Sequence, residues 1–112
     1  MEKTIEIDGK QVTFKSTGAV PKRYKMQFQR DFFADLLSME GIVKKEGASV
    51  EDIRNNVDFD VFYDIAWTLA KTADNTIKDP LTWLDEFETF PIYEILPQIQ
   101  DVLVASISTK KK

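Results

Sequence analysis

The sequence predicts an α+β fold, in which an N-terminal β-hairpin packs on a bundle of four or five α-helices. An Asp-Gly pair at positions 8 and 9 separates two short runs of alternating apolar and polar residues, a strong hairpin signal. Further along the chain, apolar residues recur every three or four positions, and several of these runs follow an Asp that can cap a helix. Strands gathered at one end of a mostly helical chain are typical of the α+β class.

The predicted hairpin pairs residues 4–7 with residues 11–15. With Asp8 and Gly9 in the turn, the register pairs Ile7 with Lys10, Ile5 with Val12, and Lys3 with Phe14. Directly opposed residues share a face, so four apolar side chains fall on one side: Ile5, Ile7, Val12 and Phe14. Because an isolated hairpin is marginally stable, we expect this face to pack against helices or another strand.

Two helices are expected between residues 20 and 40. Pro21 suits the first turn of the first helix, which carries Tyr24 and Phe28 at i and i+4. Asp31 is a suitable N-cap for the second. The apolar positions of the second helix are Phe32, Phe33, Leu36, Leu37 and Met39. One unbroken helix is the alternative, and we favour a break near Gln29 and Arg30.

The middle of the chain predicts a loop, a capped turn and a long helix. Residues 41–47 read as a loop or a frayed helix end, and Ser49 caps the short turn with Asp52 three residues on. Asp58 caps the long helix, which ends near Asn75 and Thr76. Its apolar stripe comprises Phe59, Phe62, Ala66, Leu69 and Ala70, with Trp67 beside it.

Two further helices are expected after Asp79, where a capping carboxylate precedes a proline. The first carries Leu81, Trp83, Leu84 and Phe87. The last carries a stripe of Ile92, Ile95, Leu96, Ile99, Val102, Leu103 and Ile107. Pro97 lies within that stripe and predicts either a kinked helix or a single turn leading into a helix that starts at Pro97. We expect one domain over residues 1–109 and a basic, disordered tail over residues 110–112.

Composition excludes several kinds of chemistry. The chain has no Cys and no His, which removes disulfides, thiolate and imidazole metal sites, and His-dependent nucleophilic catalysis. An enzyme would have to work with carboxylates, Lys, Tyr or hydroxyls. We therefore expect no enzymatic activity and no cofactor.

Charge is distributed unevenly along the chain, whose net charge is −4. Residues 1–50 carry 9 basic and 7 acidic residues, whereas residues 51–101 carry 3 basic and 12 acidic residues. An acidic half repels phosphate backbones, so we expect no nucleic-acid partner. Two interpretations of the acids stay open: they solubilise the outer faces of helices, or they form a face that meets a basic partner.

The localisation prediction follows from two features of the sequence. No apolar run approaches the ~20 residues of a membrane span, so we expect no membrane contact. Residues 1–6 alternate charged and apolar side chains, unlike a signal peptide. We expect a cytoplasmic protein.

Two acidic clusters invite a chemical interpretation. Asp58, Asp60 and Asp64 resemble calcium ligands, but the glycine of a calcium loop is missing and helical spacing turns the three apart. We interpret them as one N-cap and two solvated acids, and expect no metal site. Asp85, Glu86 and Glu88 could imitate an acid–base pair, but no polar cluster accompanies them, and a solvated face is the simpler interpretation.

The aromatic and basic residues have competing interpretations as well. Trp67, Trp83, Phe87 and Phe90 could anchor a partner, but at helical spacing aromatic residues more often belong to the core. The basic stretch Lys22-Arg23-Tyr24-Lys25, with Arg30, suggests DNA binding on a helix–turn–helix. The helix that follows would present Asp31 and Asp35 to the groove, which is the wrong charge.

The order of these features carries more information than any one of them. The hairpin is followed by Ala19-Val20-Pro21-Lys22-Arg23-Tyr24, Phe28-Gln29-Arg30-Asp31, Asp35-Leu36, Ala66-Trp67-Thr68-Leu69-Ala70-Lys71-Thr72-Ala73-Asp74, Trp83-Leu84-Asp85-Glu86-Phe87 and Ile95-Leu96-Pro97. This set, spanning residues 4–108, resembles the tail assembly chaperones of long-tailed (siphovirus-type) phages and prophages of Gram-positive bacteria. Gln29 departs from the pattern, because the family leads us to expect Gly between the first two helices.

The resemblance implies a function. Such a chaperone binds the tape measure protein and keeps it soluble while tail tube subunits polymerise around it, and it is absent from the finished virion. The implied partners are the tape measure protein and the tail tube protein, with self-association as a further option, and the family has no catalytic residues. We expect partner contacts from Trp83, Asp85, Glu86, Phe87, Glu88 and Phe90.

Two other functions remain as alternatives. A small acidic inhibitor or antitoxin-like module, including a DNA mimic, would bind one folded basic partner at a defined stoichiometry. A carboxylate enzyme would need a concave site that gathers Asp or Glu side chains.

Overall fold

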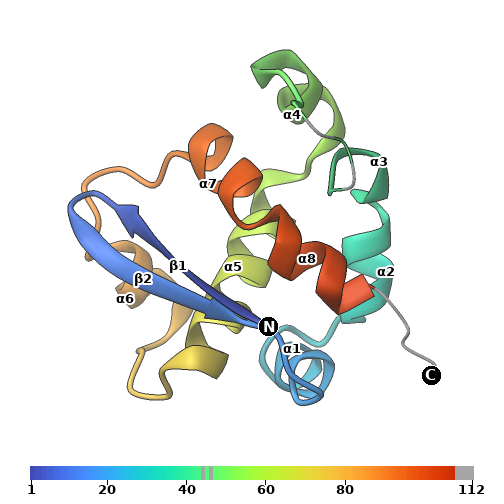
Figure 1. Ribbon diagram of the computed structural model, residues 1–112. Helices are drawn as coiled ribbons and strands as arrows, with labels where there is room; N and C mark the ends of the chain where they lie inside the picture. The colour runs from blue at the N-terminus through green and yellow to red at the C-terminus, as the bar shows by residue number, and fades with distance from the viewer. Residues whose placement is uncertain (44, 46, 108–112) are drawn as a thin grey trace.

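The computed structural model describes residues 1–43, 45 and 47–107 (Figure 1). Strands β1 (Glu2–Ile7) and β2 (Lys10–Lys15) form an antiparallel hairpin, and only helices follow in the described residues. The helices are α1 (Val20–Phe28), α2 (Phe32–Leu37), α3 (Glu40–Val43), α4 (Val50–Asn56), α5 (Phe59–Ala73), α6 (Pro80–Leu84), α7 (Ile92–Gln98) and α8 (Gln100–Ile107). The α+β prediction, with a hairpin packed on a helical bundle, is confirmed.

The hairpin has the predicted register, with Ile5 opposite Val12 and Ile7 opposite Lys10. Asp8 and Gly9 both have positive φ angles, 53° and 77°, the conformation that a tight two-residue hairpin turn requires. The predicted apolar face is buried and packs on α5: Ile5, Ile7, Val12 and Phe14. On the opposite face the hydroxyls of Thr4 and Thr13 share a hydrogen bond of 2.6 Å.

The core is centred on α5, which contacts β2, α1, α2 and α6. The consecutive residues 65–70 are all buried, so this part of α5 is enclosed on every side. Thr68 is the polar member of that run. Its hydroxyl donates to the carbonyl oxygen of Asp64 at 2.8 Å, which removes the cost of burying it.

Side-chain caps fix the starts of several helices as predicted. The carboxylates of Asp31, Asp58 and Asp79 accept hydrogen bonds from backbone N–H groups of the first turns of α2, α5 and α6. Ser49 and Asp52 form a reciprocal capping box at the start of α4. These bonds use N–H groups that would otherwise lack an intrahelical partner.

The predicted break between α1 and α2 is confirmed at Gln29. This residue has a φ of 57°, in the left-handed region that usually favours Gly after a helix. Its backbone N–H bonds to the carbonyl oxygen of Lys25 at 2.9 Å, and its side-chain amide bonds to that of Met26 at 3.0 Å. The chain therefore makes the turn that a glycine was expected to make, with a second hydrogen bond from the glutamine side chain.

Two local features differ in detail from the prediction. Residues 40–43 form α3, whereas a loop or frayed end was expected from residue 41, because Ile42 and Val43 find places in the core. Pro97 lies inside α7, and the helix is interrupted two residues later, at Ile99, rather than at the proline. The buried stripe continues across the interruption to Val102 and Leu103.

The predicted basic tail over residues 110–112, and the last two residues of the predicted domain, lie outside the described residues. Within the described part of the chain, no helix combines the length and apolar character needed to cross a membrane.

Candidate partner-binding site

The six residues expected to contact a partner divide into two groups. The rings of Trp83 and Phe87 are buried and Phe90 is half-buried, so these aromatics belong to the core, as does Trp67. By contrast, all three acidic residues are exposed: Asp85, Glu86 and Glu88. The structure therefore places the acids, rather than the rings, where a partner can reach them.

The aromatic rings support the loop that carries the acids. The Trp83, Phe87 and Phe90 rings contact one another with centroid distances of 5.4–5.7 Å and inclined or edge-to-face geometry. Phe90 also meets Tyr63 of α5 at 5.8 Å. Inclined rings at such distances attract one another in addition to burying apolar area. Residues 83–90 are thereby held against α5.

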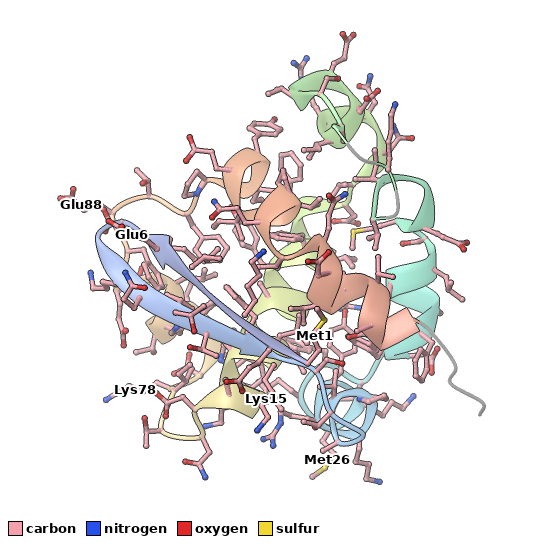
Figure 2. All side chains as sticks on the ribbon, in the orientation of Figure 1. Met1, Glu6, Lys15, Met26, Lys78 and Glu88 are labelled. Carbon is pink, nitrogen blue, oxygen red and sulfur yellow. The ribbon has the colours of Figure 1, made fainter. Side chains whose placement is uncertain are left out.

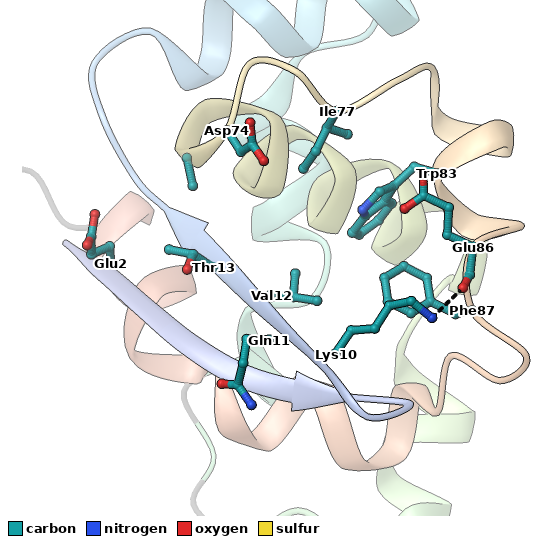
Figure 3. A pocket seen from close by; sticks show the side chains of 11 residues that line it. Glu2, Lys10, Gln11, Val12, Thr13, Asp74, Ile77, Trp83, Glu86 and Phe87 are labelled. Atoms are coloured by element: carbon teal, nitrogen blue, oxygen red, sulfur yellow. Dashed lines mark hydrogen bonds between the residues drawn. The ribbon is translucent and has the colours of Figure 1, made fainter.

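The hairpin turn holds the same loop from the other side. The backbone N–H of Glu88 donates to the Asp8 carboxylate at 2.9 Å. Figure 3 shows the second bond, in which the Lys10 ammonium donates to the carbonyl oxygen of Glu86 at 2.9 Å. The ammonium also lies 5.5 Å from the centroid of the Phe87 ring, within cation–π range. We call these contacts of Asp8 and Lys10 the turn latch.

A hollow of about 510 Å³ lies between β2, the end of α5 and the latched loop (Figure 3). Trp83 and Phe87 contribute its apolar wall, while Glu2, Asp74 and Glu86 place carboxylates around it. Hydrogen bonds from the Thr76 side chain and backbone lower the pKa of Asp74. Lys10 also lines the hollow and brings one positive charge to it.

Comparisons with protein-family models, curated proteins and solved structures give no match to this chain.

The hollow brings together two segments that are separated in the sequence. Ala73 and Asp74 come from residues 70–74, and Trp83, Glu86 and Phe87 come from residues 83–87. The sequence did not show that these segments would meet each other and the hairpin. The turn latch was missed for the same reason, since its hydrogen bonds join residues 76 and 80 positions apart.

One of the three acidic residues predicted to be an N-cap or solvated acid on α5, Asp64, has a different environment from the one predicted. Asp58 caps the helix as expected and Asp60 is exposed, but Asp64 is not a solvated acid. Its carboxylate binds the Arg30 guanidinium at 2.7 Å. In the described residues, no three acidic side chains come close enough together to hold a metal ion.

Arg30 joins three helices through a partly buried polar network. Its guanidinium donates to Asp35 at 2.8 Å, to Asp64 at 2.7 Å and to the Tyr24 hydroxyl at 3.0 Å. The Tyr24 hydroxyl in turn donates to Asp35 at 2.6 Å. Burial raises the pKa of Asp64, and the Arg30 guanidinium opposes that effect. We call this set the Arg30 network; it is structural, because its charges are satisfied internally.

The turn latch predicts a specific change in local dynamics. Asp8→Gly keeps the positive φ of the turn but removes the acceptor of the Glu88 N–H, so stability should fall by about 1 kcal/mol. Amide hydrogen exchange at Glu88 should accelerate on the order of fivefold or more, while exchange in α5 follows global stability. Asp8→Asn is the matched control, because its side-chain oxygen still accepts the bond. Equal protection of Glu88 in Asp8→Gly and the wild type would show that the latch does not hold the loop.

Proposed function

We propose that this protein is a tail assembly chaperone that binds the tape measure protein and keeps it soluble while the tail tube polymerises. The observation that carries the proposal is the meeting of residues 70–74 and 83–87 at one hollow. These segments carry the most specific part of the resemblance, and they share a surface beside the hairpin. A common surface is what a shared binding role would require.

The acidic loop supports the proposal through its charge and rigidity. Asp85, Glu86 and Glu88 are exposed on a loop held by the turn latch and the aromatic rings. A fixed group of carboxylates attracts basic segments and adds negative charge to the complex that forms. Both effects favour keeping an aggregation-prone helical client in solution.

Exposed apolar side chains supply the apolar contacts that a chaperone surface needs in addition to its charge. Leu81 of α6 is 71% exposed, and Phe33 and Leu37, one turn apart on α2, are 43% and 47% exposed. Side chains of this kind can cover the apolar face of an amphipathic client helix. Leu81 lies within four residues of the acidic loop, which places apolar and acidic contacts near each other.

Co-expression tests the proposal. The wild-type protein should raise the soluble fraction of the tape measure protein encoded beside its gene, and the two should elute together in size exclusion. The variant Asp85→Asn/Glu86→Gln/Glu88→Gln should do so at least about threefold less well, because the client loses three charge contacts. A control variant removes the same charge from three other exposed positions: Glu51→Gln/Glu94→Gln/Asp101→Asn. It should raise the soluble fraction of the client as much as the wild type does. An unchanged soluble fraction with wild-type protein and no complex would refute the proposal.

The exposed acids also favour a second function, that of a small acidic inhibitor or antitoxin-like module. Such a module would bind one folded basic partner through the same loop. Stoichiometry separates the two: a chaperone should coat a long client with several copies, while an inhibitor should bind at one fixed low ratio. Light scattering of the purified complex measures this ratio directly.

A further inference from the structure

A second hollow, of about 420 Å³, lies between α1 and α5 and has the opposite charge. Lys22, Arg23 and Met26 line it from α1, and Trp67 and Lys71 line it from α5. No carboxylate lines it in the described part of the chain. We call these five residues the basic groove. On a protein with a net charge of −4, they form a local cationic surface.

The apolar part of the basic groove is accessible. Met26 is 69% exposed and its side chain points away from the body of the protein (Figure 2). Trp67 is buried, and its indole N–H already donates to the carbonyl oxygen of Lys78 at 2.8 Å. The indole therefore needs no polar partner, and only 3% of the Trp67 surface is open. Most of the accessible apolar surface of the groove is therefore the Met26 thioether, a flexible group well suited to packing an aliphatic side chain.

The cations of the groove are not all neutralised within the chain. Lys22 and Arg23 form no hydrogen bond or ion pair through their side chains with any described residue. The Nε–H of Arg23 is sealed from solvent without an acceptor, which is costly for a charged group. Lys71 differs, since its ammonium donates to the carbonyl oxygens of Asn75 and Ile77. Lys71 thus contributes charge, while Arg23 has unused donors for an incoming carboxylate.

We infer that the basic groove binds an acidic amphipathic segment of a partner protein, with an aliphatic side chain against Met26 and Trp67 and carboxylates on Lys22 and Arg23. A helix presents such residues on one face at i, i+3 and i+4. The Arg23 Nε–H is sealed from solvent, so an incoming carboxylate would pair with the terminal N–H groups of the guanidinium. The inference does not depend on the chaperone proposal, because that proposal uses the acidic loop and a basic client.

The test uses the ¹⁵N-labelled protein and a defined probe. The probe is a helical peptide of about 15 residues with Leu and Glu on one face, and a second peptide has Lys in place of each Glu. Each of the two tryptophans gives one indole N–H signal, so Trp67 reports directly on the groove. The acidic peptide should shift the Trp67 indole signal and the α1 amides saturably, and the basic peptide should not.

A matched pair of charge reversals locates the binding. Lys22→Glu lies in the groove and should weaken binding of the acidic peptide roughly fivefold or more. Lys25→Glu is on the same helix but outside the lining and should change it less than about twofold. Unchanged melting curves confirm that both variants fold. Three results would each overturn the inference: no saturable shifts, equal binding of the basic peptide, or tighter binding of an oligo-dT at the same residues.

Discussion

Replacing Phe14 with alanine should lower the free energy of unfolding by ~3–5 kcal/mol, as expected for truncating a fully buried Phe. The Phe14 ring has 0% exposure and lies on the hairpin face that packs on α5. Truncation leaves a cavity where β2 packs on α5, and a two-stranded hairpin is marginally stable without such packing. Denaturant unfolding measures the loss.

Gln11→Ala is the control for this experiment. Gln11 is exposed on the same strand, so its truncation should change stability by less than about 0.5 kcal/mol. A loss below about 1 kcal/mol for Phe14→Ala would show that the hairpin face is not part of the cooperative core.

Arg30→Met should lower the free energy of unfolding by about 2 kcal/mol. It removes both the Asp35 and the Asp64 ion pairs and leaves Asp64 half-buried without its cation. The full cost of breaking a buried pair is not expected, because the Arg30 side chain is 42% exposed. Tyr24 still donates to Asp35, so the unpaired Asp64 dominates the loss.

The pH dependence of stability and a double variant test whether the unpaired Asp64 causes the loss. Burial raises the pKa of Asp64, and without Arg30 nothing nearby opposes that effect. The folded variant then holds a proton that the unfolded chain releases, so its stability falls as pH rises through the raised pKa. The difference in free energy of unfolding between the wild type and Arg30→Met should be larger at about pH 7 than at about pH 5. Arg30→Met/Asp64→Asn should recover at least about half of the loss, and failure to do so would assign the loss to packing.

Much of the fold could be predicted because its signals lie in residues that are close together in the sequence. The hairpin register follows from two turn residues and the side-chain alternation, and the helix starts follow from Asp31, Asp58 and Asp79. Each of these features depends on residues at most a few positions apart. Tertiary packing was needed to fix α3, where two apolar side chains draw a segment that contains Gly41 into a helix.

Contacts between distant segments could not be predicted in this way. Asp64 has the spacing of a solvent-facing residue on α5, and only the fold brings Arg30 to it from 34 positions away. The exposed acids at 85, 86 and 88 were identified from the sequence, but the turn latch that fixes them was not. Lys22, Arg23 and Trp67 had each been noted separately, and the packing of α1 on α5 joins them in one groove.

The packing of the hairpin on α5 has a consequence for biosynthesis. The ribosome completes β2 at Lys15 but does not complete α5 until Ala73. At ~5–20 residues per second, the apolar side of the nascent hairpin has no native partner for roughly 3–12 s. The hairpin alone is too weak to persist during that time. Translation therefore releases an unpaired, apolar N-terminal segment, and the emergence of α5 from the exit tunnel is the event that allows it to fold.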